Sequence, residues 1–254
     1  MTAHRGLILA AGRGSRLKAL TADRPKGLVE LLGRPLIDWQ LYALQGAGIS
    51  DIAFVSGYKS DALQRYRLPM FDNVRWAETN MVRSLTCADS WLSQAATVIS
   101  YSDIVYDAET VTRLASSDGD VSVSFDPQWR TLWSARFSDP LSDAETFARD
   151  AEGYIVDIGR KPAGYSEIQG QYMGLVKLTP RGWRHVSDYL GRLPPEIVDK
   201  LDMTGLLQRL IQAGVRVNAV PAAGPWAEVD SETDLALYAE PGRVKLPPLP
   251  PMAS

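Results

Sequence analysis

The stretch at residues 7–26 constrains the fold of this chain most, because it places a short apolar run directly before a glycine-rich turn. The run LILA is typical of a buried parallel strand, and Gly12 and Gly14 let the backbone turn so that its N–H groups face an anion. Arg16 and Lys26 add two cations close to the end of this strand. Backbone donors beside two cations favour a polyphosphate over a neutral ligand, and two ordinary solvated charges are the alternative.

Two familiar glycine motifs are absent from this turn. A dinucleotide-binding motif needs the pattern G-x-G-x-x-G, but Leu17 occupies the third glycine position. The phosphate loop G-x-x-x-x-G-K-[ST] is missing as well, because Lys26 stands in the segment RPKG. The turn therefore predicts neither a dehydrogenase nor a P-loop or kinase-like protein.

Strands and helices alternate along the first half of the chain, which predicts an α/β fold with a doubly wound, mostly parallel sheet flanked by helices. Past Asp107, two strands joined by a short turn predict a hairpin, so we expect a mixed sheet. We expect one domain at 1–240 and a proline-rich tail at 241–254 that extends outside the fold. The predicted strands are 7–10, 51–57, 73–78, 96–103, 121–125, 146–150, 154–161, 171–178 and 217–222, and the predicted helices are 35–47, 60–66, 84–92, 181–190, 204–212 and 231–238.

Composition and charge exclude several classes of protein. A net charge of −3 argues against a nucleic-acid-binding surface, which normally has a clustered basic face. Cys87 is the single cysteine and excludes an intrachain disulfide, and His4 and His185 have no partners at metal-ligand spacing. No apolar run approaches the roughly eighteen residues that span a bilayer, so we expect a cytoplasmic protein without a membrane partner. The sequence leaves a homo-oligomer open.

Residues 10–16 match the pattern A-A-G-x-G-[ST]-R, and residues 24–26 match R-P-K. With these motifs the chain resembles the nucleotidyltransferases that activate sugar phosphates and other small phosphates, and the resemblance extends from residue 5 to about 240. It implies that Arg16 grips the leaving pyrophosphate and that Lys26 contacts the α-phosphate under attack. The nucleotide-binding residues that it implies are Leu9, Ala10, Ala11, Gly12, Gly14, Ser15, Gly57, Asn80, Ser84 and Ser102.

The resemblance narrows to cytidylyltransferases through the segments SGYKSD, ETNMVRSL and ISYSDIVY. These are similar to enzymes that activate phosphocholine, aminoethylphosphonate and other phosphonates, or phosphoglutamine in capsule polysaccharide modification. The segments YSDIVY and DPLSDAETF resemble the phosphoglutamine group most. By resemblance Asn80 and Ser84 would read the edge of a cytosine base, and a helix cap is the alternative role for both.

Two aspartates are the predicted ligands of a Mg²⁺ ion. Asp103 lies where the predicted strand 96–103 ends, and ligands of open α/β sheets bind at such strand ends. Asp230 stands directly before a predicted helix, so a helix cap is the alternative to a metal ligand. Relatives carry one aspartate after the central strand and a second in an [ED]-[VI]-D segment, and both match here. Glu228 lies on the same strand face as Asp230 and could assist or replace it as a metal ligand.

The resemblance implies a Rossmann-like, GT-A-like fold with a nucleotide half at about 1–107 and an acceptor half with a β-rich insert at about 108–240. By resemblance Lys161 contacts the phosphate of the acceptor. Trp129 and Trp133 share a face if their segment is helical, and they could then hold a cationic head group together with nearby carboxylates; burial in the core is the alternative. Gln169 and Gln171 alternate at the start of a predicted strand. They could contact an amide or a carboxylate of the acceptor, and exposure to solvent is the alternative. The acceptor candidates are Trp129, Trp133, Asp143, Glu145, Gln171 and Glu228, with Asp126 and Gln169 beside them.

Taken together, the resemblance implies a Mg²⁺-dependent cytidylyltransferase that transfers CMP from CTP to a small phosphorylated or phosphonate acceptor, such as phosphoglutamine, and releases pyrophosphate. An amine-bearing acceptor fits the acidic insert better than a neutral hexose does. Two alternatives are a sugar-1-phosphate nucleotidylyltransferase that uses UTP, dTTP or GTP, and a nucleotide-sensing subunit without catalysis. The chain retains Arg16, Lys26, Asp103 and Asp230 together, which argues against the sensing subunit.

Overall fold

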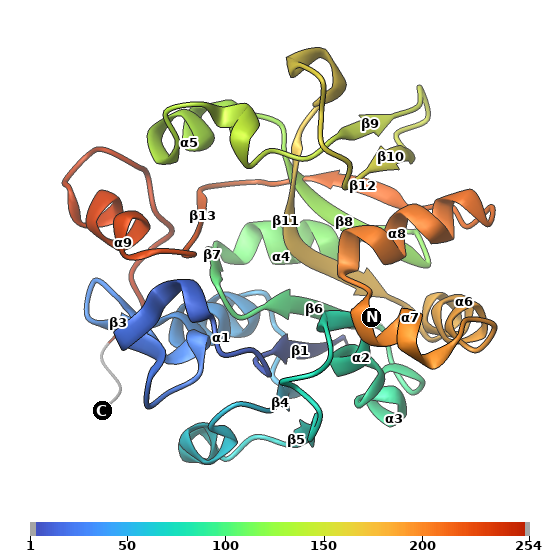
Figure 1. Ribbon diagram of the computed structural model, residues 1–254, viewed down its shortest axis with the longest axis horizontal. Helices are drawn as coiled ribbons and strands as arrows, with labels where there is room; N and C mark the ends of the chain where they lie inside the picture. Colours follow the sequence, from blue (N-terminus) through green and yellow to red (C-terminus); the bar gives the residue numbers. More distant parts are fainter. Residues whose placement is uncertain (1–3, 252–254) are drawn as a thin grey trace.

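The computed structural model describes residues 4–251, and a seven-stranded sheet runs through its middle (Figure 1). Strand β11 is antiparallel to its neighbours β6 and β8, whereas the other pairs in this sheet are parallel. The sheet is therefore mixed but mostly parallel, which confirms the predicted fold class. In spatial order the strands are β12 (Asn218–Pro221), β8 (Val121–Asp126), β11 (Gln171–Leu178), β6 (Thr97–Tyr101), β1 (Arg5–Leu9), β4 (Ile52–Ser56) and β5 (Met70–Asp72).

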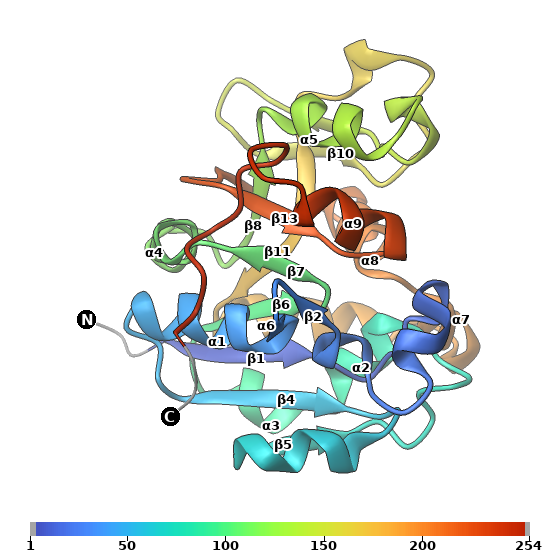
Figure 2. The same cartoon turned by 90° about the vertical axis from the view of Figure 1, so that its left-hand side faces the viewer.

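Helices cover both faces of the sheet, as the two ribbon views show (Figures 1 and 2). The α-helices are α1 (Leu36–Gly46), α2 (Met81–Thr86), α3 (Asp89–Leu92), α4 (Ala108–Ala115), α5 (Trp129–Arg136), α6 (Pro180–Leu190), α7 (Pro195–Lys200), α8 (Met203–Gln212) and α9 (Glu232–Ala239). Short 3₁₀ helices are η1 (Ser15–Thr21), η2 (Lys26–Leu28), η3 (Ser60–Tyr66), η4 (Pro140–Ser142) and η5 (Tyr165–Glu167). Within residues 4–251, no helix is both long enough and apolar enough to cross a bilayer.

The apolar core forms two clusters, one on each face of the sheet. Successive side chains of a strand point to opposite faces, so Leu7 and Leu9 belong to one cluster and Ile8 to the other. Trp39 of α1 packs in the cluster of Ile8, and Trp183 of α6 packs in the cluster of Leu7. This two-sided burial explains why β1 reads as a continuous apolar run.

Three small two-stranded pairs complete the fold. They are β2 (Glu30–Leu31) with β3 (Arg34–Pro35), β7 (Ile104–Tyr106) with β13 (Trp226–Glu228), and β9 (Phe147–Arg149) with β10 (Ile155–Ile158). The β9–β10 pair is antiparallel and confirms the predicted hairpin. The β7–β13 pair joins segments from the two halves of the chain, and both of its strands lie beside the site described below.

Two local predictions are wrong. The strand predicted at 73–78 lies instead at β5, because the side chain of Asn73 accepts a hydrogen bond from the backbone N–H of Arg75 (3.0 Å) and starts a turn. The helix predicted at 84–92 is two short helices, α2 and α3, because Ala88 leaves the helical region (φ −96°, ψ 24°). The predicted helices also do not include α4 and α7.

The described part of the C-terminal tail differs from its prediction. Val244 and Leu246 pack against the core instead of extending away from it, and the backbone carbonyl of Pro250 accepts a hydrogen bond from Arg34 (3.3 Å). Figure 2 shows this segment running alongside the domain. Apolar contacts hold a proline-rich segment here even though it has no repeating pattern.

Candidate active site

The loop after β1 lies directly against Lys26. Gly14 has a left-handed backbone (φ 70°) and precedes η1. A Cβ atom on Gly14 would lie 2.8 Å from side-chain carbons of Lys26, so only glycine suits both the backbone and the space. At Gly57, a Cβ atom would lie 2.8 Å from the carbonyl oxygen of Ala11. Close backbone packing therefore shapes the loop.

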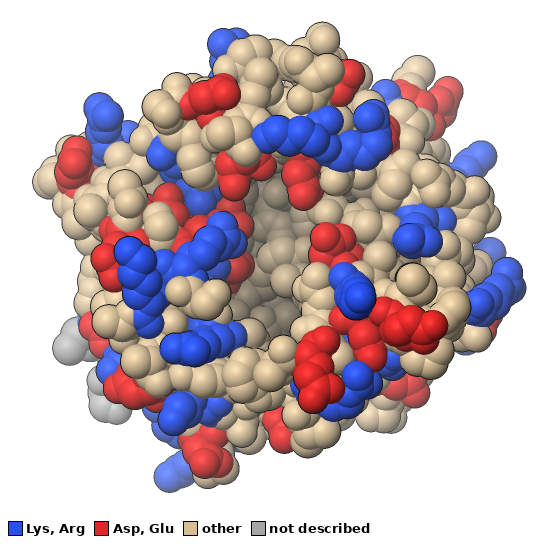
Figure 3. Space-filling model, viewed as in Figure 1, with Lys and Arg blue, Asp and Glu red and all other residues tan. Residues whose placement is uncertain are grey.

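A cleft opens beside this loop and consists of two neighbouring hollows that share Met81 and Tyr101 in their walls. Figure 3 shows the depression near the centre of the molecular face. The first hollow has a volume of about 220 Å³ and the second of about 260 Å³. Lys26 and Asp103 line the first hollow, whereas Arg16 and Asp230 line the second, so the charged groups lie at the junction.

Most of the predicted nucleotide-binding residues line the first hollow. The wall includes Leu9, Ala11, Gly12, Gly14, Asn80, Ser84 and Ser102. Ala10, Ser15 and Gly57 are not in this wall. Ala10 is buried and its N–H donates to the carbonyl of Val55 (2.8 Å), whereas Ser15 is exposed on η1. Trp76 and Thr79, which the sequence did not single out, complete the wall.

Asn80 and Ser84 both have structural partners within that wall. The side chain of Asn80 accepts a hydrogen bond from the N–H of Met81 (2.8 Å), so it is the N-cap of α2, as the alternative interpretation predicted. The Ser84 hydroxyl accepts a bond from the side-chain amide of Asn73 (2.9 Å) and is 6% exposed. Ser84 lies inside α2, so the cap interpretation is wrong for it, and both Asn80 and Ser84 line the hollow.

Lys26 is a buried ammonium between two carboxylates. Its Nζ atom donates to Asp103 Oδ2 (2.7 Å) and to Asp230 Oδ1 (2.6 Å), and the residue is 7% exposed. Burial alone would lower the pKa of Lys26, but Asp103 and Asp230 outweigh it and raise that pKa to about 12. Lys26 is therefore charged, and it is not an ordinary solvated cation.

Asp230 receives a second cation from the loop. Arg16 Nη2 donates to Asp230 Oδ1 (2.7 Å), although the Arg16 side chain itself is mostly exposed. Burial would raise the pKa of Asp230, yet Lys26, Arg16 and Arg136 hold it below its usual value. The cap of helix α9 is Ser231, not Asp230, so the capping alternative for Asp230 is wrong.

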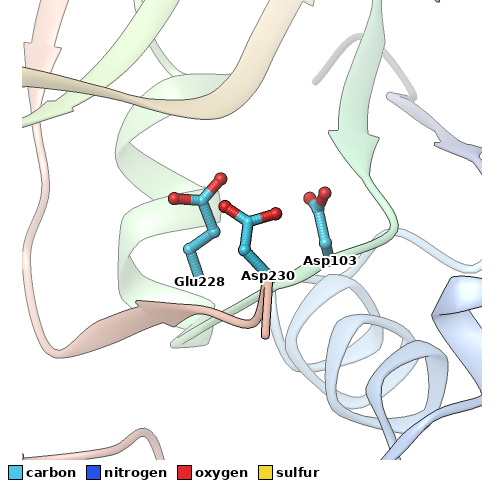
Figure 4. A group of neighbouring side chains, drawn as sticks. All are labelled: Asp103, Glu228 and Asp230. Atoms are coloured by element: carbon cyan, nitrogen blue, oxygen red, sulfur yellow. The ribbon is translucent and has the colours of Figure 1, made fainter. Parts of the chain in front are cut away.

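Pairing of β7 with β13 brings the two aspartates together. Glu228 lies opposite Ile104 in this pair, and the N–H of Val229 donates to the carbonyl of Asp103 (2.8 Å). Asp103 at one strand end and Asp230 at the other consequently face the same space, although they are far apart in the sequence. Figure 4 shows the carboxylates of Asp103, Glu228 and Asp230 side by side.

These three carboxylates fit a divalent cation. Each offers an oxygen atom, and the three atoms lie within 4.8 Å of one another. Asp103 Oδ1 is buried and has no hydrogen-bond partner among the described residues, so it has an unused acceptor. Burial and the charge of Asp230 raise the pKa of Glu228 above its usual value, although Arg136 opposes this. Hard oxygen donors of this kind suit Mg²⁺ and similar ions.

The second hollow contains most of the predicted acceptor residues. Its wall includes Trp133, Asp143, Glu145, Gln171 and Glu228, and also Asp202 and Trp226, which sequence reasoning missed. Asp202 caps helix α8 by accepting the N–H of Gly205 (2.8 Å). A helix cap at Asp202 can be recognised in the sequence, but the sequence does not indicate that Asp202 lines the second hollow.

The two tryptophans of α5 differ in role. The segment is helical, and the Trp129 and Trp133 rings meet edge to face with centroids 6.2 Å apart. Both are buried, as the core alternative predicted, but Trp133 also lines the second hollow whereas Trp129 packs against Tyr165. Of the two tryptophans, only Trp133 faces the second hollow.

The remaining candidates lie outside the wall of the cleft or have structural partners. Lys161 donates to the backbone carbonyls of Leu141 and Ser142, the latter at 2.7 Å, and is not part of either hollow. Asp126 accepts a bond from the indole of Trp226 (2.9 Å), and Gln169 accepts the N–H of Arg149 (2.9 Å). Neither Asp126 nor Gln169 lines the second hollow.

Gln171 does line the second hollow, and it is 4% exposed, so it does not face solvent. Its side-chain amide donates to the carbonyl of Glu145 (2.7 Å) and accepts the N–H of Glu145 (3.3 Å). Both halves of the amide are therefore used on one peptide segment. Gln171 fixes the backbone that carries the Glu145 carboxylate.

Two adjacent hollows meet at a charged junction of Lys26, Asp103, Arg16 and Asp230, as the resemblance to nucleotidyltransferases leads us to expect. Residues 6–154 match the MobA-like NTP transferase domain, so the chain belongs to this nucleotidyltransferase family, which confirms the resemblance and the enzyme class.

Individual relatives give a narrower comparison. The chain is 37% identical over 251 residues to a CTP:phosphoglutamine cytidylyltransferase of Campylobacter jejuni subsp. jejuni serotype O:2, covering 92% of this chain and 98% of the relative. It is 30% identical over 159 residues to a 2-aminoethylphosphonate cytidylyltransferase of Lancefieldella rimae, covering 61% of this chain and 60% of the relative.

A solved structure shows the same fold. The inositol-1-phosphate CTP transferase from T. maritima superposes with a TM-score of 0.75 at 18% identity, covering 93% of this chain and 94% of that one. At this identity the likeness concerns the fold alone.

Proposed function

We propose that this protein transfers CMP from CTP to a small, amine-bearing phosphate or phosphonate in the presence of Mg²⁺ and releases pyrophosphate. Phosphoglutamine is the first candidate for the acceptor. The observation that carries the proposal is the pair of hollows meeting at Lys26, Asp103 and Asp230, in a chain that aligns along almost its whole length with a CTP:phosphoglutamine cytidylyltransferase. We further expect a cytoplasmic enzyme.

The first hollow suits a pyrimidine nucleotide. Asn80, Ser84 and Ala11 line it together with the aromatic residue Trp76. Bases are recognised by hydrogen bonds at their edges and by stacking on aromatic rings. Cytosine is supported over other bases by the relatives, several of which are named as cytidylyltransferases.

The second hollow suits an acceptor with a positive charge. Asp143, Glu145 and Asp202 line it together. Burial raises the pKa of Glu145, and the charges of Asp202 and Asp143 raise it further. Carboxylates crowded in this way favour a cation between them, so an ammonium group would be drawn to this end of the acceptor.

In the reaction that we propose, an oxygen of the acceptor phosphate or phosphonate attacks the α-phosphorus of CTP. The new P–O bond forms as the bond between the α-phosphorus and the bridging oxygen to the β-phosphate breaks, and pyrophosphate leaves with that electron pair. The attacking oxygen is already anionic near neutral pH, so no general base is required. Catalysis then depends on positioning and on neutralising charge.

Lys26 and Arg16 supply the positive charge from the protein. Lys26, which is charged and buried at the junction, would stabilise the charge on the α-phosphate during attack. Arg16 is exposed enough to swing and would bind the leaving pyrophosphate. A Mg²⁺ ion held by Asp103, Asp230 and Glu228 would supply further charge neutralisation at the phosphates.

The test is a pyrophosphate-release assay with Mg²⁺ that crosses CTP, UTP, dTTP and GTP with four acceptors. These are phosphoglutamine, phosphocholine, 2-aminoethylphosphonate and glucose 1-phosphate. Release that needs CTP and an amine-bearing acceptor is expected. Release only with glucose 1-phosphate would replace the proposal by the sugar-phosphate alternative, and nucleotide binding without release from any pair would favour the sensing subunit.

A further inference from the structure

The side chain of Arg136 is fully buried and contacts three carboxylates beside the site. It is the last residue of α5, and its side chain is 0% exposed. Its guanidinium donates to Glu228 Oε2 (2.9 Å), to Asp234 Oδ1 (2.9 Å) and to Asp230 Oδ2 (3.5 Å). Two of these acceptors belong to the three carboxylates that fit a divalent cation.

The contact with Asp234 extends this support to the backbone of Asp230. Asp234 Oδ2 accepts the N–H groups of Asp230 (2.9 Å) and Ser231 (3.0 Å), and it also accepts a bond from Arg136 (3.3 Å). Arg136 and Asp234 therefore hold both the side chain and the main chain of Asp230. The same arrangement ties α5 to the start of α9.

Arg136 cannot touch a substrate directly, because its side chain has no exposed surface. It lies behind the carboxylates, with its guanidinium 5.3 Å from the ring centroid of Trp133, which lines the acceptor hollow. Lys26 pairs with Asp103 and Asp230, and Arg16 pairs with Asp230, but in the proposed reaction both cations bind phosphates. Arg136 is the cation that would stay with Glu228 and Asp230 throughout.

We propose that Arg136 is the positioning residue for the metal-binding carboxylates. It binds Oε2 of Glu228 and Oδ2 of Asp230, so that Oε1 of Glu228 and Oδ1 of Asp230, which Lys26 and Arg16 now contact, remain for the cation. A planar guanidinium can bond several carboxylates at once in fixed directions, which the point charge of a lysine cannot do. This inference rests on the divalent-metal part of the proposed function, and it adds a residue that the sequence motifs do not contain.

The experiment compares Arg136→Lys with Arg130→Lys, because Arg130 lies on the same helix but is exposed and stacks over Tyr165 (4.1 Å). Binding of Mn²⁺ is measured by electron paramagnetic resonance of the free ion, without nucleotide or acceptor. We expect about tenfold weaker Mn²⁺ binding in Arg136→Lys, since partners behind metal ligands typically change metal affinity by about 10–100-fold. Arg130→Lys should match the unmodified protein.

Two further measurements separate positioning from general damage. CTP affinity in the presence of EDTA should stay within about twofold in Arg136→Lys, because Arg136 does not line the nucleotide hollow. If Arg136→Lys fails to fold, Asp234→Asn takes its place. An asparagine oxygen can still accept the N–H of Asp230, but the charge that anchors Arg136 is gone, so Mn²⁺ binding should again weaken several-fold.

The outcomes distinguish this inference from the proposed function. Equal Mn²⁺ affinity in the unmodified protein and in the folded variants would overturn the role of Arg136 and leave the metal site in place. A parallel loss of CTP and Mn²⁺ affinity would overturn it too, because the effect would then be general. No Mn²⁺ binding by the unmodified protein would overturn both this role and the metal part of the proposed function.

Discussion

Replacing Lys26 with methionine removes one buried charge and leaves an unbranched apolar side chain that is one atom shorter. Lys26 is the bonded partner of both Asp103 and Asp230 and is 7% exposed, so solvent cannot take over its role. If Lys26 neutralises the α-phosphate in the transition state, turnover should fall at least a hundredfold, which corresponds to about 2.7 kcal/mol on the barrier.

The same substitution should lower stability by a predictable amount. Removing one partner of a buried ion pair costs about 3–5 kcal/mol. Here Asp230 keeps Arg16 and Arg136, and mainly Asp103 loses its partner, so we expect about 2 kcal/mol. For a chain of this size that corresponds to a decrease of about 4–8 °C in Tm. Adding a divalent cation should raise the Tm of Lys26→Met more than the Tm of the unmodified protein, because the cation restores positive charge between the carboxylates.

The assay pairs pyrophosphate release under saturating substrates with thermal unfolding in EDTA and in MgCl₂. Lys200→Met is the matched control, because Lys200 is exposed on α7 and lines neither hollow. Turnover within threefold of the unmodified enzyme would refute the catalytic role of Lys26. An unchanged Tm in EDTA would refute the electrostatic reasoning about the buried network.

Three further predictions concern two residues of the cleft and one ion-pair group outside it. Gly14→Ala should weaken CTP binding at least tenfold by titration calorimetry, because alanine would adopt φ 70° and crowd the Lys26 side chain at 2.8 Å; unchanged affinity would contradict the loop packing. Glu145→Gln should reduce kcat/KM for 2-aminoethylphosphonate about tenfold but leave ethylphosphonate, which lacks the amine, unchanged; equal effects on both would exclude an ammonium subsite at Glu145. Asp199→Asn should lower Tm at neutral pH, since Arg83 and Arg75 bind Asp199 at 2.6 and 2.7 Å and hold its pKa below the usual value of 3.8. That stabilisation is present above pH 3.8 and is lost as the pH falls through the lowered pKa, so the Tm difference should vanish in strong acid and not in base.

The parts of the fold that the sequence predicted are those with strong local signals. The apolar runs of β1, β4 and β6 are buried on both faces, so each is recognisable without its neighbours. The strand near residue 73 was misplaced because a single side-chain bond from Asn73 turns the chain. Helix α4 was missed although Asp107 caps it by accepting the N–H of Thr110 (2.9 Å), since its short amphipathic pattern lies where the strand rhythm changes.

The candidate site likewise contains some residues that short sequence motifs predict and others that they do not. Gly14, Lys26 and Asp103 stand in short motifs, and the resemblance that these motifs carry is enough to place them at one cleft. Arg136 stands in no motif, and its partner Asp230 is 94 residues away along the chain. Arg136 pairs with Asp230 and Asp234 because the fold places the segment from β13 to α9 beside α5. No local sequence pattern predicts this tertiary contact.

The charged network at the junction explains how so many ionised groups can be buried in one place. A buried charge is tolerated when it is paired, and Lys26, Asp103 and Asp230 each have a partner of opposite sign. In the proposed function, the phosphates of a nucleotide would offer Lys26 and Arg16 an equivalent anion, and a divalent cation would offer the carboxylates an equivalent charge. Substrate binding would then exchange the partners of these ion pairs without leaving any charge unpaired, provided that Glu228 and Asp230 keep their orientation. Arg136 is the one cation of this network that has no route to a phosphate, so it is the natural element to hold that orientation during the exchange.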